Sequence, residues 1–153
     1  MRKSIGLVEL KSIPVGIKVS DEMLKAANVE LVLATPICPG KYVILVSGDV
    51  GAVKSSVQRG VKEGSIFVVD HQMINNVHED VLRAVAGTSE YGELSAVGVI
   101  ETISSISSIK AGDLAVKSAD VSLIEIRIAR GLGGKGFLIF SGEISAVKSA
   151  IQS

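Results

Sequence analysis

The sequence has a single cysteine, no tryptophan and only 3% aromatic residues among its 153 residues. One cysteine cannot form a disulfide within the chain, and this usage is typical of a protein of the reducing cytoplasm. With so few aromatic side chains, a core must be built mainly from Val, Ile, Leu and Ala, and apolar residues do reach 47% of the chain.

An excess of either charge is also absent, because sixteen basic residues balance sixteen acidic ones. This balance gives no support to binding of nucleic acid or of an anionic membrane surface. No apolar run approaches the length of a membrane-spanning helix, and Glu9 interrupts the first apolar segment, so no secretory signal is expected. The apolar residues are therefore expected in a dense core or in subunit interfaces.

The sequence contains an internal repeat, since residues 96–101 (AVGVIE) match residues 4–9 (SIGLVE). The match continues through Asp21 with Asp113, Lys25 with Lys117, Ser47 with Ser141, and residues 52–55 with 146–149. Its period is too long for a solenoid. We therefore predict two homologous α/β domains, residues 1–87 and 96–153, joined by a polar linker at 88–95. The second copy lacks a counterpart of residues 62–86, so it is expected to be incomplete at its C-terminal end.

Hydrophobic periodicity predicts the elements of the first copy. Asp49 is the expected N-cap of the second helix, because its carboxylate can accept the free N–H groups of the first turn. The expected elements are strands at 4–9, 29–34, 42–46 and 66–70, and helices at 13–27, 50–63 and 78–86.

The lone cysteine lies in a short loop between two predicted strands. The loop consists of Ile37, Cys38, Pro39, Gly40 and Lys41. Pro restricts φ and Gly accepts positive φ, so this sequence predicts a tight turn that places Cys38 near the surface. The corresponding loop of the second copy, residues 129–134, is rich in glycine and has no cysteine.

Three segments together resemble the bacterial microcompartment (BMC) shell-domain family: residues 5–9 (IGLVE), 21–30 (DEMLKAANVE) and 48–54 (GDVGAVK). A tandem pair of such domains resembles the trimeric class, in which three two-domain chains imitate a hexamer. The resemblance implies an α/β (α+β) fold of two BMC domains, each a small, mostly antiparallel sheet with helices on one side. It also implies a homotrimer that assembles with other shell proteins around a cytoplasmic bacterial microcompartment.

The Cys38 loop further resembles that of the iron–sulfur T-type shell proteins of propanediol-utilisation compartments. This resemblance implies that Cys38 supplies one ligand per chain to a [4Fe–4S] cluster at the central pore, with Ile37, Pro39, Gly40 and Lys41 forming the pore loop. A threefold axis past Cys38 would gather three thiolates, and the fourth ligand would come from outside the protein. Such a cluster would transfer electrons across the shell to encapsulated redox enzymes, or it would gate the pore.

Lys25 and Lys117 match the lysine that this family places where neighbouring tiles meet, so the resemblance implies that both are lateral-assembly residues. Family members often carry an Arg between two prolines before a His near the domain end. Here the stretch 74–78 (INNVH) keeps only the histidine, His78. Edge packing is therefore expected to differ from that of the family.

The sequence is also compatible with two other functions. One is a shell tile with an open metabolite pore and no cluster, and the other is a regulatory trimer of ferredoxin-like domains that binds a small ligand. An enzyme is not expected, because no nucleophile–base motif or telling pair of carboxylates is present. His71 and His78, with Asp70 and Glu79 beside them, are a candidate zinc site. A local capping role for His78 fits its position better.

Overall fold

The computed structural model describes residues 4–128 and 130–153. The chain divides into two compact units, Met1–Val77 and His78–Ser153. Within the described residues, no helix combines the length and the apolar character needed to cross a membrane.

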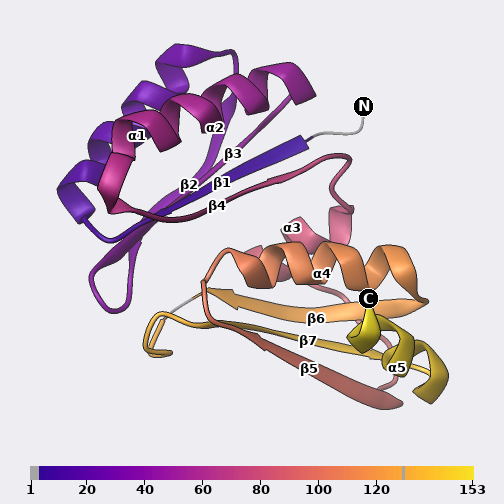
Figure 1. Ribbon diagram of the computed structural model, residues 1–153. Coiled ribbons are helices and arrows are strands. Elements are labelled where there is room, and N and C mark those ends of the chain that lie inside the picture. The colour runs from indigo at the N-terminus through magenta and orange to yellow at the C-terminus, as the bar shows by residue number, and fades with distance from the viewer. Residues whose placement is uncertain (1–3, 129) are drawn as a thin grey trace. The chain divides into compact units, whose positions relative to one another are not determined.

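The first unit is a four-stranded antiparallel sheet with two helices on one face (Figure 1). Its strand order is β2-β3-β1-β4, so β1 lies inside the sheet with a neighbour on each side. The elements are β1 (Ser4–Leu10), α1 (Ile13–Ala26), β2 (Glu30–Ile37), β3 (Lys41–Gly48), α2 (Val50–Gly64), the 3-10 turn η1 (Ser65–Phe67) and β4 (Val68–Ile74).

The core of this unit lies between the sheet and the two helices. Side chains alternate across a strand, so Val8 and Leu10 face the helices while Glu9 points to the opposite face. Aliphatic residues dominate this core, as the scarcity of aromatics predicts. Its buried members are Val8, Leu10, Val19, Met23, Tyr42, Ile44, Val46, Val53 and Val57, with Val68 and Met73 of β4 packed against them.

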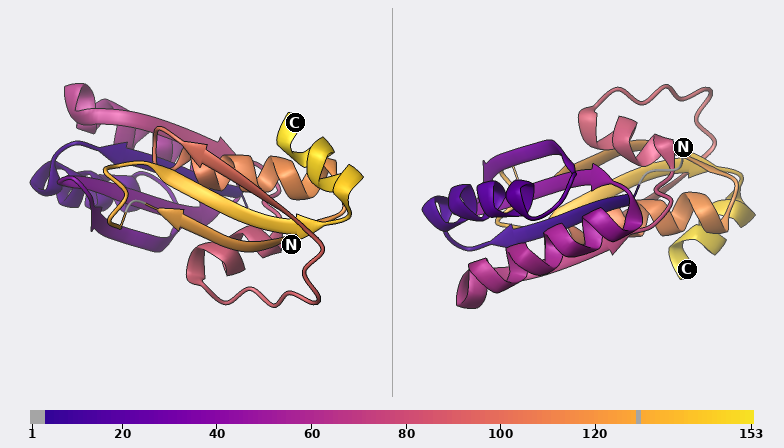
Figure 2. Two further views of the ribbon diagram at one scale, coloured as in Figure 1. Left: turned by 90° about the horizontal axis from the view of Figure 1, so that it is seen from below. Right: turned by 90° about the horizontal axis from the view of Figure 1, so that it is seen from above.

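The second unit repeats this plan with one strand fewer (Figure 2, left, with β7 between β5 and β6). Its strand order is β5-β7-β6, and residues 78–128 and 130–153 contain no strand that corresponds to β4. The elements are α3 (Glu79–Ala86), β5 (Ala96–Thr102), α4 (Ser107–Ser118), β6 (Val121–Ile128), β7 (Gly136–Gly142) and α5 (Ile144–Gln152).

The short helix α3 belongs to the second unit, whereas the sequence pattern predicted a first domain that extends to residue 87. It packs against β6 and α4, and its Val81 and Ala84 are buried. The backbone N–H of His78 donates to Oδ1 of Asp113 at 2.9 Å, and Nδ1 of His78 accepts the N–H of Asp80 at 3.3 Å. His78 therefore caps α3, as its position in the sequence suggested.

The helices predicted at 13–27 and 50–63 are observed as α1 and α2, with ends that agree to within one residue. Asp49 stands at the N-cap of α2, but its carboxylate makes no capping hydrogen bond, and its backbone carbonyl accepts the N–H of Val53 at 2.9 Å. The strand predicted at 66–70 begins later, at Val68, because residues 65–67 form the turn η1.

Candidate functional site

The predicted loop around Cys38 is the tip of the β2–β3 hairpin. Ile37 and Lys41 are the last paired residues, and Cys38, Pro39 and Gly40 connect them. The N–H of Gly40 donates to the carbonyl of Ile37 at 3.1 Å, and Gly40 has a φ of +85°. Glycine suits this conformation because a side chain there would be strained. The peptide bond between Cys38 and Pro39 is cis.

Cys38 is a free, exposed thiol, while its neighbour Ile37 is buried and anchors the end of β2. In the described part of one chain, no three His, Cys, Asp or Glu side chains are close enough to hold a metal ion together. An iron–sulfur cluster requires about four ligands. A cluster at Cys38 would therefore have to draw its ligands from several chains.

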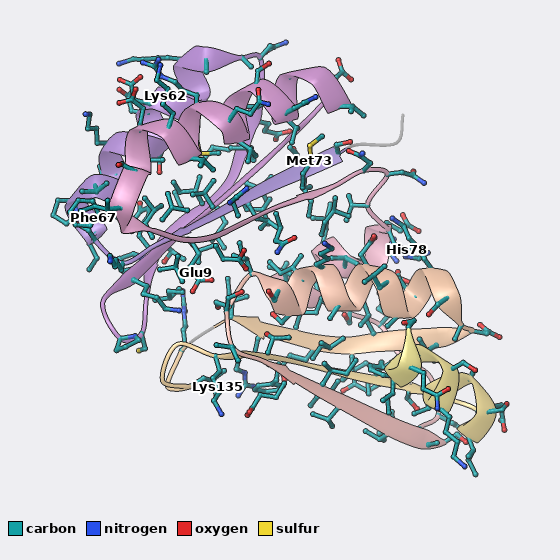
Figure 3. All side chains as sticks on the ribbon, viewed as in Figure 1. Glu9, Lys62, Phe67, Met73, His78 and Lys135 are labelled. Carbon is teal, nitrogen blue, oxygen red and sulfur yellow. The ribbon has the colours of Figure 1, made fainter. Side chains whose placement is uncertain are left out.

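Lys41, at the base of this hairpin, forms an ion pair with Glu9 of β1 (Glu9 is labelled in Figure 3). Glu9 lies opposite Val43 in the β1–β3 ladder, so Lys41 is its diagonal neighbour on the same face. The side chain of Lys41 is 14% exposed and that of Glu9 is fully buried. This shielded pair connects the hairpin base to the central strand.

The second unit has the same pair at the same place. Nζ of Lys135, also labelled in Figure 3, lies 2.8 Å from Oε1 of Glu101, and Glu101 is opposite Phe137 in the β5–β7 ladder. This pair is exposed, with side-chain exposures of 53% and 65%. The loop before Lys135 contains no thiol. Both copies therefore have the ion pair at the base of the hairpin, but only the first copy has a cysteine at the hairpin tip.

Lys25 lies in the last turn of α1 and its side chain is exposed. Its Nζ donates to Oδ2 of Asp21 at 2.5 Å. The hydrogen bond from Lys25 to Asp21, supported by the charge of that carboxylate, raises the pKa of Lys25 above the ordinary 10.5. Lys25 therefore stays charged throughout the physiological range.

A shallow groove of about 520 Å³ runs beside Lys25 between α1 and α2. Across it, Arg59 donates to Oε2 of Glu22 from Nε at 3.1 Å and from Nη2 at 2.6 Å. The hydrogen bonds to Glu22 raise the pKa of Arg59, and the charge of Glu63 adds to this effect. The groove is lined by Glu22, Lys25, Ala26, Ser55, Gln58, Arg59 and Lys62.

Lys117, the counterpart of Lys25, has different surroundings. Its Nζ donates to Oδ2 of Asp113 at 2.5 Å, and the nearly buried Asp113 also accepts the N–H of His78. Lys117 is therefore part of the contact that holds α3, whereas Lys25 is more exposed. The two lysines predicted as edge residues are not equivalent in the structure.

Sequence reasoning missed two features of this site: the paired roles of Glu9 and Glu101, and the anchoring role of Asp113. The roles of Glu9 and Glu101 could have been found in the sequence. A glutamate within an apolar strand recurs at the same place in both copies, and so does the lysine after each loop. No comparable signal was present for Asp113, because its hydrogen bond to the N–H of His78 is a long-range contact.

The structure and sequence are similar to those of known shell proteins. The family model described as BMC domain matches residues 4–77 and 96–153. The bacterial microcompartment shell protein PduT of Citrobacter freundii is 39% identical over 151 residues, which are 99% of this chain and 82% of that protein.

Two solved structures are similar to this chain in fold. A microcompartment protein from Desulfitobacterium hafniense superposes with a TM-score of 0.88 at 45% identity, covering 99% of this chain and 84% of that one. The fused permuted hexameric shell protein of the RMM microcompartment gives a TM-score of 0.70 at 19% identity, over 97% of this chain and 77% of that one. The second likeness concerns the fold alone.

Proposed function

Because this chain belongs to the BMC-domain family and is a structural shell protein of a bacterial microcompartment, we propose that three copies form one tile with the Cys38 hairpins around a central opening. Each chain supplies two BMC domains, so three chains give the six domains of a pseudohexamer. The observation that carries the proposal is the exposed thiol of Cys38 at the tip of a hairpin.

The donor chemistry of this hairpin suits a [4Fe–4S] cluster. Three Cys38 thiolates related by a threefold axis would supply three of the four ligands, and a ligand from outside the protein would supply the fourth. Ile37 is buried at the end of β2, Gly40 allows the turn, and Lys41 holds the hairpin base through Glu9. These contacts restrict how the sulfur atoms can move relative to the sheet.

The bound cluster would supply one-electron transfer at the centre of the tile. Its position in a shell makes electron exchange with encapsulated redox enzymes the role we propose. Gly40 at the turn and the ion pair of Lys41 with Glu9 at the hairpin base would hold the sulfur atoms in place.

We propose that Lys25, more than Lys117, takes part in lateral assembly with other shell tiles. Its ammonium group is exposed at the end of α1, and Asp21 engages one of its three donors. Backbone carbonyls of a neighbouring tile could accept the others. Lys117 has less freedom, because it is held at Asp113 beside α3.

The deciding experiment measures iron and acid-labile sulfide per trimer in anaerobically purified protein, beside a Cys38→Ser variant. About four irons per three chains, lost in the variant while the trimer persists, would support the cluster. Intact trimers without iron in either protein would contradict it and leave Cys38 as the lining of an open metabolite pore. Discrete trimers that never form sheets would contradict the tile.

A further inference from the structure

The groove between α1 and α2 contains polar side chains that the fold of one chain leaves unused. Its α2 wall is a single stripe of the helix, made of residues three or four apart: Ser55, Gln58, Arg59 and Lys62. Within the described residues, no hydrogen bond or ion pair engages the side chains of Ser55, Gln58 or Lys62 (Lys62 is labelled in Figure 3). Their hydroxyl, amide and ammonium groups are therefore available to a ligand.

The charges that line the groove favour an anionic ligand. Arg59 holds Glu22, the carboxylate in the lining, through two hydrogen bonds. Asp21 engages one of the three ammonium donors of Lys25. Lys62 has no such partner in the part of the chain that the structure describes. The two lysines therefore keep donors for a negatively charged group.

These two lysines stand toward opposite ends of the groove. Because α1 and α2 run antiparallel, Lys25 near the end of α1 lies toward the start of α2, whereas Lys62 lies toward the end of α2. The step from Ser55 to Lys62 spans about 10 Å, at about 1.5 Å per helical residue. A ligand with two negative groups about 10 Å apart therefore fits this arrangement.

The segment between the two units carries the complementary charge. Residues 84–95 contain two acidic residues, Glu90 and Glu93, and no basic residue. Residues 90–94 are exposed and form neither helix nor strand. An extended chain advances about 3.3 Å per residue, so the two carboxylates can lie about 10 Å apart. The ring of Tyr91 between them can stack on the guanidinium group in the groove.

The segment and the groove each lie at the end of their own unit that is remote from the hairpin. The segment leads into Ala96, which is opposite Gly142 at the end of β7. Helix α1 leads into Glu30, which is opposite Ser47 near the end of β3. In both units the hairpin is at the other end of these strands. If the hairpins surround the centre of a tile, as proposed above, the segment and the groove both lie toward its rim.

We propose that residues 90–94 of one copy dock in the α1–α2 groove of a second copy in a neighbouring tile. Glu90 and Glu93 bind at the two lysines of the groove, and Tyr91 stacks between them. The two surfaces are different parts of the same chain, so the contact is of the head-to-tail kind that can extend from tile to tile. Its position at the rim rests on the proposed tile, whereas the charges and spacings that argue for the contact do not.

The probe is a capped peptide with the sequence of residues 87–96, titrated into the full chain with 13C-labelled alanine methyl groups. We expect a saturable shift of the Ala26 methyl signal, because Ala26 lines the groove, with half-saturation at about 1 mM or below. A matched peptide with Glu90→Gln and Glu93→Gln keeps the size but not the charge, and it should bind about fivefold more weakly or worse. The affinity of the acidic peptide should fall with added salt.

Charge exchange tests the contact in the assembled protein. Lys62→Glu should weaken peptide binding about fivefold or more, and should reduce sheets in negative-stain electron microscopy, because it places a carboxylate where the acidic segment docks. Adding Glu90→Lys or Glu93→Lys to this variant should restore the sheets. Lys54→Glu, on α2 but outside the groove, is the control and should change neither measurement. All four positions are exposed, so the variants should fold.

Three results would overturn the proposal: no saturation at Ala26 up to about 5 mM peptide, equal affinity of the acidic and neutral peptides, or equal weakening by Lys62→Glu and Lys54→Glu. If neither exchange variant restores the sheets that Lys62→Glu loses, the second copy is not the occupant. Wild-type trimers that bind the peptide but never form sheets would contradict the proposed tile and still support the docking contact between copies.

Discussion

Lys135 and Glu101, with 2.8 Å between Nζ and Oε1, form the same diagonal ion pair in the second unit that Lys41 and Glu9 form in the first. In both units the glutamate lies opposite the residue two places after the lysine. The pairs differ in their contact with solvent, since the first is shielded and the second exposed. They are therefore expected to differ in their contribution to stability.

Replacing Lys41 with methionine should destabilise the protein by about 3 kcal/mol, because it leaves the buried Glu9 carboxylate without this partner. The matched variant Lys135→Met should cost less than about 1 kcal/mol, since its pair is exposed to water. Urea unfolding followed by circular dichroism measures both. Equal shifts in the two midpoints would show that burial does not distinguish the pairs.

Asp113→Ala should release α3 from the second unit. The substitution removes a charged acceptor from the N–H of His78 and from Lys117, at a cost of about 2 kcal/mol. Hydrogen exchange at residues 79–86 should accelerate more than elsewhere. The homologous Asp21→Ala breaks only an exposed helix pair and should leave the free energy of unfolding almost unchanged. Unchanged exchange in α3 would refute the anchoring role.

Gly16→Ala should destabilise the first unit by about 1–3 kcal/mol through overpacking. A Cβ atom there would lie 2.5 Å from the ring of Tyr42, which is buried next to the Cys38 hairpin. Gly51→Ala is the control: nothing lies within 4 Å of its Cβ, and alanine favours the helix by up to about 1 kcal/mol. Thermal unfolding should therefore shift in opposite directions for the two variants.

Lys25→Ala should reduce the assembly of tiles into sheets, seen by negative-stain electron microscopy, without changing the trimer in sedimentation. Lys54→Ala, at an exposed position of α2, is the control and should assemble normally. Sheets of unchanged extent in the Lys25 variant would count against an edge role.

The same lysine gives a pH prediction. Asp21 raises the pKa of Lys25 above its ordinary 10.5, so its pairing stabilises α1 below pH 10.5 and is lost as the pH rises through the raised pKa. The charge of Lys25 should then stay constant between about pH 6 and 9. Titration of the ammonium group by NMR checks the shift, and a pKa below 10.5 would contradict it.

Much of the fold followed from local patterns in the sequence. The short apolar run of β1 is typical of a buried strand. The helical spacing of apolar residues specifies α1 and α2, because side-chain direction repeats about every 3.6 residues in a helix. The turn at Cys38 followed from Pro39 and Gly40. The position of α3 could not be predicted in this way, because its packing against β6 and α4 depends on contacts between residues distant in the sequence.

The sequence by itself determined the duplication, the family and the place of Cys38 at a hairpin tip, since each depends on residues that are adjacent or repeated along the chain. Only the tertiary structure decided which ion pair is shielded, which of Lys25 and Lys117 is more exposed, and where α3 packs. These properties depend on burial and strand order, which arise when distant segments pack and which residue type alone does not specify.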